Sequence, residues 1–96
     1  MLYEKKLGSF QKVVEELSTL DPDAGVRAQG RFNARNCFVF VTKYMDVFTV
    51  ALYSVKVVKK ESLPDKRLLV KQFPSLPEVE KFLSGVVKKP VKASAY

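Results

Sequence analysis

Apolar positions recur at helical spacing near both ends of this chain and alternate with polar positions through its middle. The first helical pattern has the i, i+3, i+4, i+7 spacing of an amphipathic helix and consists of Phe10, Val13, Val14 and Leu17. Ser9 is a suitable N-cap, and the Asp-Pro-Asp turn at residues 21–23 ends the pattern. These signals predict a helix of about three turns that begins after Ser9, and the alternative is a start near Tyr3 with Gly8 as a weak point.

A second helix is predicted after residue 75. Residues 75–78 read Ser-Leu-Pro-Glu, which matches a capping box with proline in the first turn. An apolar stripe at 3.6-residue spacing follows at Leu76, Val79, Phe82, Leu83, Val86 and Val87. This helix is expected to end between Gly85 and Lys88.

Four segments between the helices have the alternation or the β-branched and aromatic content of strands: residues 25–32, 37–44, 47–58 and 66–73. The first three are joined by short loops, which favours antiparallel pairing of consecutive strands. The expected fold class is α+β, a four-stranded antiparallel meander with an N-terminal and a C-terminal helix on one face (α-β-β-β-β-α). We expect one domain over residues 1–88 and a flexible basic tail over residues 89–96.

The short break at Met45-Asp46 sets the register of the central hairpin. A two-residue loop there and a four-residue loop over residues 44–47 give the same pairing, in which Phe38 faces Tyr53. That register separates an aliphatic face from an aromatic face, because side chains alternate along each strand. The aromatic face holds Phe38, Phe40, Thr42, Tyr44, Thr49, Ala51, Tyr53 and Val55.

The outer strands are placed less directly. A loop over residues 33–36 pairs Phe32 with Cys37 and adds Arg27 and Arg31 to the aromatic face. If Leu68 of the last strand faces the core together with Val70, the aromatic face also gains Arg67, Leu69 and Lys71.

Charge is concentrated on the predicted sheet. The chain carries 17 Lys and Arg against 10 Asp and Glu, a formal net charge of +7 at pH 7. Residues 26–60 hold seven of the basic side chains and one acidic side chain. Such an imbalance attracts polyanions, although a solvated basic surface kept for solubility has the same composition.

Candidate catalytic chemistry is sparse. The chain has no His and a single Cys, Cys37, which removes the common zinc sites and the Ser-His-Asp and Cys-His arrangements. We therefore expect no enzyme activity, no metal and no cofactor. The lone cysteine fits a reducing cytoplasm, and no apolar run approaches the ~20 residues of a membrane span.

The element order resembles that of the ThermoDBP-related single-stranded-DNA-binding proteins of hyperthermophilic archaea. The similarity is carried by the aromatic strand over residues 38–44, the long strand over 47–58 and the closing helix over 75–87. Heavy use of Val and Lys without His or Trp is also typical of thermophiles. The resemblance implies a cleft beside the sheet in which hydrophobic and basic residues take the bases.

These observations predict a binding protein for single-stranded nucleic acid, DNA rather than RNA, without sequence specificity. Aromatic side chains would stack on bases and basic ones would contact phosphates, with the candidate site comprising Arg27, Arg31, Arg35, Phe38, Phe40, Tyr44, Tyr53, Arg67 and Lys71. The alternative is a protein-interaction module or obligate homodimer whose aromatic face is the subunit interface. A homodimer is expected under either hypothesis, since a bare aromatic face is a large apolar patch.

Overall fold

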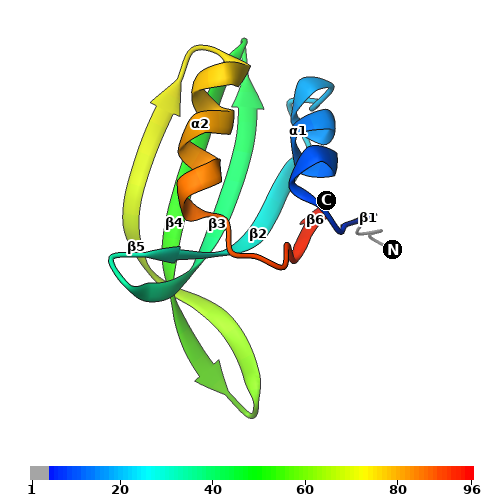
Figure 1. The fold of residues 1–96 in the computed structure, drawn as a ribbon. Helices are drawn as coiled ribbons and strands as arrows, with labels where there is room; N and C mark the ends of the chain where they lie inside the picture. Colours follow the sequence, from blue (N-terminus) through cyan, green and yellow to red (C-terminus); the bar gives the residue numbers. More distant parts are fainter. Residues whose placement is uncertain (1–4) are drawn as a thin grey trace.

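Two helices and six strands make up residues 5–96, the part of the chain that the computed structural model describes. Residues 1–4, the first four of the predicted domain, lie outside it. In chain order the elements are β1 (Lys5–Leu7), α1 (Phe10–Ser18), β2 (Gly25–Phe32), β3 (Arg35–Tyr44), β4 (Val47–Val58), β5 (Glu61–Phe73), α2 (Leu76–Val86) and β6 (Ala93–Ala95). Both helices lie on the same side of one curved sheet (Figure 1).

The sheet has the strand order β1-β6-β2-β3-β4-β5, and every neighbouring pair is antiparallel. The predicted α+β class is confirmed, and β2 to β5 form the predicted meander. The predicted number of four strands is wrong, because β6 and β1 extend the sheet beyond β2. Each of these two strands has only three residues, too few for an alternating pattern to be recognised.

Strand β6 lies inside the stretch predicted to be a flexible tail, residues 89–96. It pairs with β1 on one side and with β2 on the other, and its Ala93 and Ala95 are buried. Tyr96 continues the pairing: its N–H donates to the Gly25 carbonyl, and its carbonyl accepts from the Gly25 N–H, both at 2.9 Å. The predicted domain boundary at residue 88 therefore leaves out a strand of the domain.

The helices begin where their sequence signals indicate. The Ser9 hydroxyl oxygen caps α1 by accepting a hydrogen bond from the Lys12 N–H at 3.2 Å. At α2 the Ser75 hydroxyl donates to the Glu78 carboxylate at 3.2 Å and makes no cap to the backbone. The helices bury their apolar stripes in the core through Val13, Leu17, Val79, Leu83 and Val86.

The core fills the space between the helices and the aliphatic face of the sheet. The sheet contributes fully buried side chains from its three central strands, namely Val26, Val39, Val41, Val50 and Leu52. Gly30 lets the end of α2 approach the sheet, because a Cβ at this position would lie 2.7 Å from the Val86 carbonyl oxygen. With both helices on this face, the aromatic face is left to the strands and loops alone.

Two of the predicted registers can be compared residue by residue. The central hairpin has the predicted pairing, with Phe38 opposite Tyr53. The hairpin between β2 and β3 is tighter than predicted, since Phe32 pairs with Arg35 across a loop of residues 33–34. Both loop residues have positive φ, 51° and 63°, which matches the twist of the strands. The pairing has slid by two residues, so each side chain keeps its predicted face.

The register of β5 differs from the predicted one. Its pairing with β4 shifts on both sides of Tyr53, and each shift places one extra β5 residue opposite β4. As a result Leu69 pairs with Leu52 on the core side, whereas Arg67 lies opposite Tyr53 on the aromatic face. Lys71 lies on the same side as Leu69, so its predicted place on the aromatic face is wrong.

Beyond Ser54, β4 has β5 as its only neighbour, because the pairing with β3 ends there. Residues 55–64 form a two-stranded ribbon, here called the arm. Its loop consists of Lys59 and Lys60, both with positive φ. Figure 1 shows this ribbon at the bottom, projecting from the sheet away from the helices.

Candidate nucleic-acid interface

Three half-buried aromatic side chains form the centre of the helix-free face. Phe38 and Phe40 lie two residues apart on the same face of β3, and Tyr53 of β4 lies opposite Phe38. The ring centroids of Phe40 and Tyr53 are 5.4 Å apart with the rings nearly perpendicular (88°). The Phe38 and Phe40 centroids are 6.4 Å apart with a 39° tilt. None of these pairs is stacked face to face, so the cluster is held by edge contacts.

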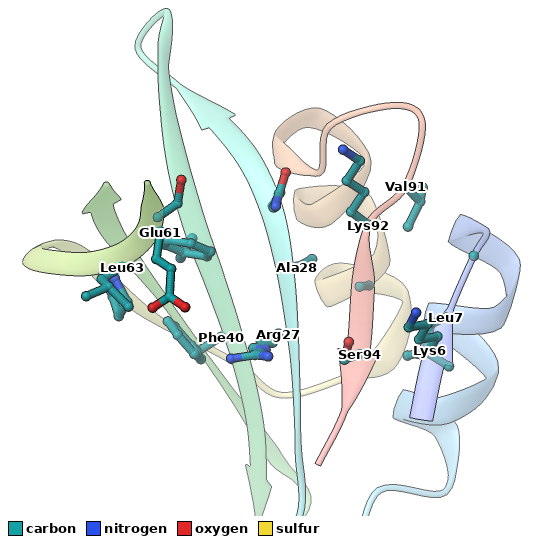
Figure 2. Close-up of a pocket in the computed structure, with 16 residues that line it drawn as sticks. Lys6, Leu7, Arg27, Ala28, Phe40, Glu61, Leu63, Val91, Lys92 and Ser94 are labelled. Atoms are coloured by element: carbon teal, nitrogen blue, oxygen red, sulfur yellow. The ribbon is translucent and has the colours of Figure 1, made fainter. Parts of the chain in front are cut away.

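Two members of this cluster, Phe38 and Phe40, lie on the floor of a groove of about 890 Å³, here called the aromatic groove. Its floor consists of residues 27–29 of β2 with Phe38 and Phe40 of β3. Residues 61–64 of the arm form one wall, and residues 6–8 and 91–94 form the other. Figure 2 shows Phe40 between Leu63 of the arm on one side and Ser94 of β6 on the other.

Two further hollows adjoin the aromatic groove. One, of about 360 Å³, shares Phe40 and Pro64 with it and continues toward Tyr53 and Tyr96. Another, of about 70 Å³, shares Gln29, Phe38 and Ser62 with it. The hollowed surface therefore runs along β3 and β4 past all three clustered rings.

Basic side chains outnumber acidic ones around the groove. Among residues 5–96, Lys6, Arg27 and Lys92 line it, against the single carboxylate of Glu61. Arg27 lies opposite Phe40 in the sheet, which places a guanidinium next to an aromatic ring on the floor. Figure 2 shows the Glu61 side chain extending from the arm toward Phe40 and Arg27.

Seven of the nine predicted site residues share the helix-free face by strand alternation: Arg27, Arg31, Phe38, Phe40, Tyr44, Tyr53 and Arg67. Arg27, Phe38 and Phe40 line the aromatic groove, and Tyr53 lines the hollow that adjoins it. Arg31 and Arg67 lie on this face but line none of the three hollows.

Two predicted residues lie on the helix side of the sheet, and Tyr44 lies far from the groove. Lys71 extends over the rings of Phe73 and Phe82 on the helix side, with its Nζ 5.6 and 5.7 Å from their centroids. Arg35 is the first residue of β3 and lies two residues before buried Cys37. Its side chain is therefore on the same side of the sheet as Cys37, the helix side. Tyr44 shares the aromatic face but stands 69% exposed at the far end of β3, outside the hollows.

Several groove residues carried no recognisable signal in the sequence. Lys6 and Lys92 reach the groove, and Tyr96 reaches the hollow that adjoins it, because β1 and β6 join the sheet beside β2. Residues 61–64 reach it because the arm bends at the two bulges. Tyr96 also covers Gly25, where a Cβ would lie 2.8 Å from its ring. A longer side chain at position 25 would displace the ring from the hollow.

Reactive groups are not assembled in the described part of the chain. Within residues 5–96 no three His, Cys, Asp or Glu side chains are grouped so as to hold a metal ion. Burial raises the pKa of the Cys37 thiol, which keeps this side chain in its protonated, weakly nucleophilic form. No helix over the same residues is long and apolar enough to cross a membrane.

Comparison with known proteins adds no assignment to this geometry. The chain matches no protein-family model, and no curated protein or solved structure is significantly similar to it.

Proposed function

We propose that this protein binds single-stranded nucleic acid, preferably DNA, in the aromatic groove and without sequence specificity. The observation that supports this most is the cluster of Phe38 and Phe40 on the floor of a groove with basic residues along it, with Tyr53 in the hollow that adjoins the groove. Aromatic rings stack on any base, since every base has a π-face, and this gives affinity without sequence reading. The resemblance to archaeal single-stranded-DNA-binding proteins is a separate prediction of the same function.

The groove favours an unpaired strand over a duplex. In a duplex the base faces are covered by their neighbours, so stacking on Phe38 or Tyr53 requires a base that is free to leave the stack. The arm and β6 form walls on the two sides of the floor, and a single strand would lie between them. Lysine and arginine side chains along the walls and floor would neutralise phosphates as the bases stack.

The experiment is a fluorescence-anisotropy titration of labelled oligo-dT, oligo-rU and a duplex of equal length at several salt concentrations. With about four phosphate contacts, the slope of log affinity against log salt is expected near −3 for the single strand, about 60-fold between 0.05 and 0.2 M. The duplex should bind more weakly, because it cannot stack. Binding of the single strand that is absent or independent of salt would contradict the proposal.

A pair of lysine variants separates groove contacts from the net charge. Lys92 lines the groove, whereas Lys71 lies on the helix side over aromatic rings. Lys92→Gln should reduce the magnitude of the salt slope by about 0.7, the contribution of one phosphate contact. Lys71→Gln removes the same charge and should leave the slope unchanged. Equal slopes for both variants would show that only the overall charge matters.

The second candidate function is a homodimer whose interface is the aromatic face. It is favoured by apolar side chains on this face outside the groove, Tyr44 at 69% and Val70 at 44% exposure. Light scattering on the anisotropy samples distinguishes the two functions. A dimer that persists while it binds saturating oligo-dT means that the subunit interface lies outside the binding face. A dimer that does not bind oligo-dT supports the aromatic face as the subunit interface.

A further inference from the structure

Within residues 5–96, the two strands of the arm pair with each other and with no further strand. The pairing of β3 with β4 ends at Ser54, after which β4 and β5 pair only with each other as far as the loop at residues 59–60. Within the arm, Val57 is 69% exposed and Leu63 is 37% exposed. A two-stranded ribbon without a third strand or a helix against it is only marginally stable in water. Its length is thus not explained by the packing of the core.

The bend at the base of the arm directs it along the groove. The two register shifts that flank Tyr53 insert extra residues into β5, and such bulges bend a strand and increase its twist. At the same place the Lys66 N–H donates a hydrogen bond to the Ser54 hydroxyl at 3.0 Å. Residues 61–64 consequently line the same groove as Phe38 and Phe40.

The arm carries unpaired positive charge at its end. Lys56, Lys59 and Lys60 are exposed, and none of them forms an ion pair with another side chain in residues 5–96. Glu61 is the only acidic residue in the arm, and it extends into the groove (Figure 2). A second copy of this basic chain would meet these lysines with like charge, whereas a phosphate backbone is complementary to them.

We propose that the arm is a second contact surface for the single strand, which places the lysines of its loop on phosphates beside the aromatic groove. This inference rests on the proposed function and extends the site by residues 56–60. The aromatic floor holds bases, and the arm holds the backbone of the same strand where it leaves the floor.

The test uses a variant that improves the loop while it removes its charge. Lys59→Asn with Lys60→Gly supplies the residues that two-residue loops with positive φ prefer, so the fold should be retained. The control is Lys12→Gln with Lys81→Gln, which removes two exposed charges from the helices. The readouts are oligo-dT affinity against salt and the melting temperature.

We expect the loop variant to reduce the magnitude of the salt slope by about 1.4, which corresponds to about 60-fold weaker binding at 0.05 M salt and convergence with the wild type near 1 M. The helix control should keep the wild-type slope. A loop variant with the slope of the control overturns the role of the arm while the proposed function stands. A wild-type protein that shows no salt-dependent binding overturns both.

A second variant tests the arm by its shape. Replacement of residues 57–62 by Asn-Gly shortens the ribbon by two residues on each strand and leaves Lys56 opposite Leu63 beside the new loop. The shortened protein should still bind through the floor, but oligo-dT should dissociate faster than from the wild type. Unchanged dissociation contradicts the inference. A dimer that is lost when the arm is shortened assigns the arm to a second copy and also contradicts it.

Discussion

Removal of residues 93–96 is expected to unfold the protein. These residues supply β6, which lies between β1 and β2, so their loss detaches β1 from the sheet and leaves the edge of β2 unpaired. Buried Ala93 and Ala95 also cover part of the core. Since domains of this size have only about 5–15 kcal/mol of stability, circular dichroism should show little folded protein at 37 °C. A truncated chain that melts like the full chain would contradict the placement of β6.

A single substitution tests the same strand without shortening the chain. Ala95→Asp puts an unpaired carboxylate at a position that is 8% exposed on the core side, which typically costs several kcal/mol. A loss of about 3 kcal/mol lowers the melting temperature of a domain this small by about 12–24 °C. Ser94→Asp is the control, because Ser94 faces the groove on the other side of the same strand. It should keep the melting temperature and weaken oligo-dT binding.

Combined Phe38→Ala and Tyr53→Ala substitution is expected to reduce affinity for oligo-dT by about 30-fold or more. Each aromatic platform contributes about 1–3 kcal/mol per stacked base, and the two rings are cross-strand neighbours on the helix-free face. Both side chains are only half-buried, so the melting temperature should fall by a few degrees. Anisotropy at fixed salt measures the first effect, and thermal denaturation measures the second.

Leu52→Ala is the matched control for this loss of affinity. Leu52 precedes Tyr53 in β4 but points into the core and is fully buried. Its truncation should cost about 2–5 kcal/mol of folding free energy through lost burial and the cavity left behind. Affinity of the remaining folded protein should be unchanged. If Leu52→Ala abolished binding while the aromatic variant bound normally, the assignment of the two faces would be reversed.

The assignment of side chains to the two sheet faces was predictable for β2, β3 and β4. Side chains alternate with a period of two, so a pairing error of two residues changes the partners and leaves the faces intact. This happened in the first hairpin, where Phe32 pairs with Arg35 instead of Cys37. Arg27 and Phe40 were therefore placed together on the correct face although their exact pairing was not predicted.

The same reasoning failed in β5 because bulges add single residues. One extra residue reverses every later assignment along a strand, and nothing in residues 66–73 marks where it lies. Lys71 was consequently predicted for the aromatic face but lies on the helix side, while Arg67 lies beyond one bulge and opposite Tyr53.

The walls of the groove depend on contacts between distant parts of the chain. Strands β1 and β6 pair Lys5 with Ala95 across nearly the whole sequence, and neither has a pattern of its own. A polar stretch that is typical of a connection, residues 59–65, begins in the arm, yet the bend at the bulges brings residues 61–64 beside Phe38. Local patterns predicted the aromatic floor, whereas the walls required the three-dimensional structure.

The most direct test of the proposed function is ultraviolet crosslinking of oligo-dT to the protein, followed by trypsin digestion and mass spectrometry. Cleavage after Arg35, Lys43 and Lys56 separates two peptides from the aromatic face, residues 36–43 with Phe38 and Phe40 and residues 44–56 with Tyr53. Binding in the aromatic groove predicts crosslinks on these two peptides. Crosslinks concentrated on residues 72–81, which include the first half of α2 on the opposite face, would contradict it.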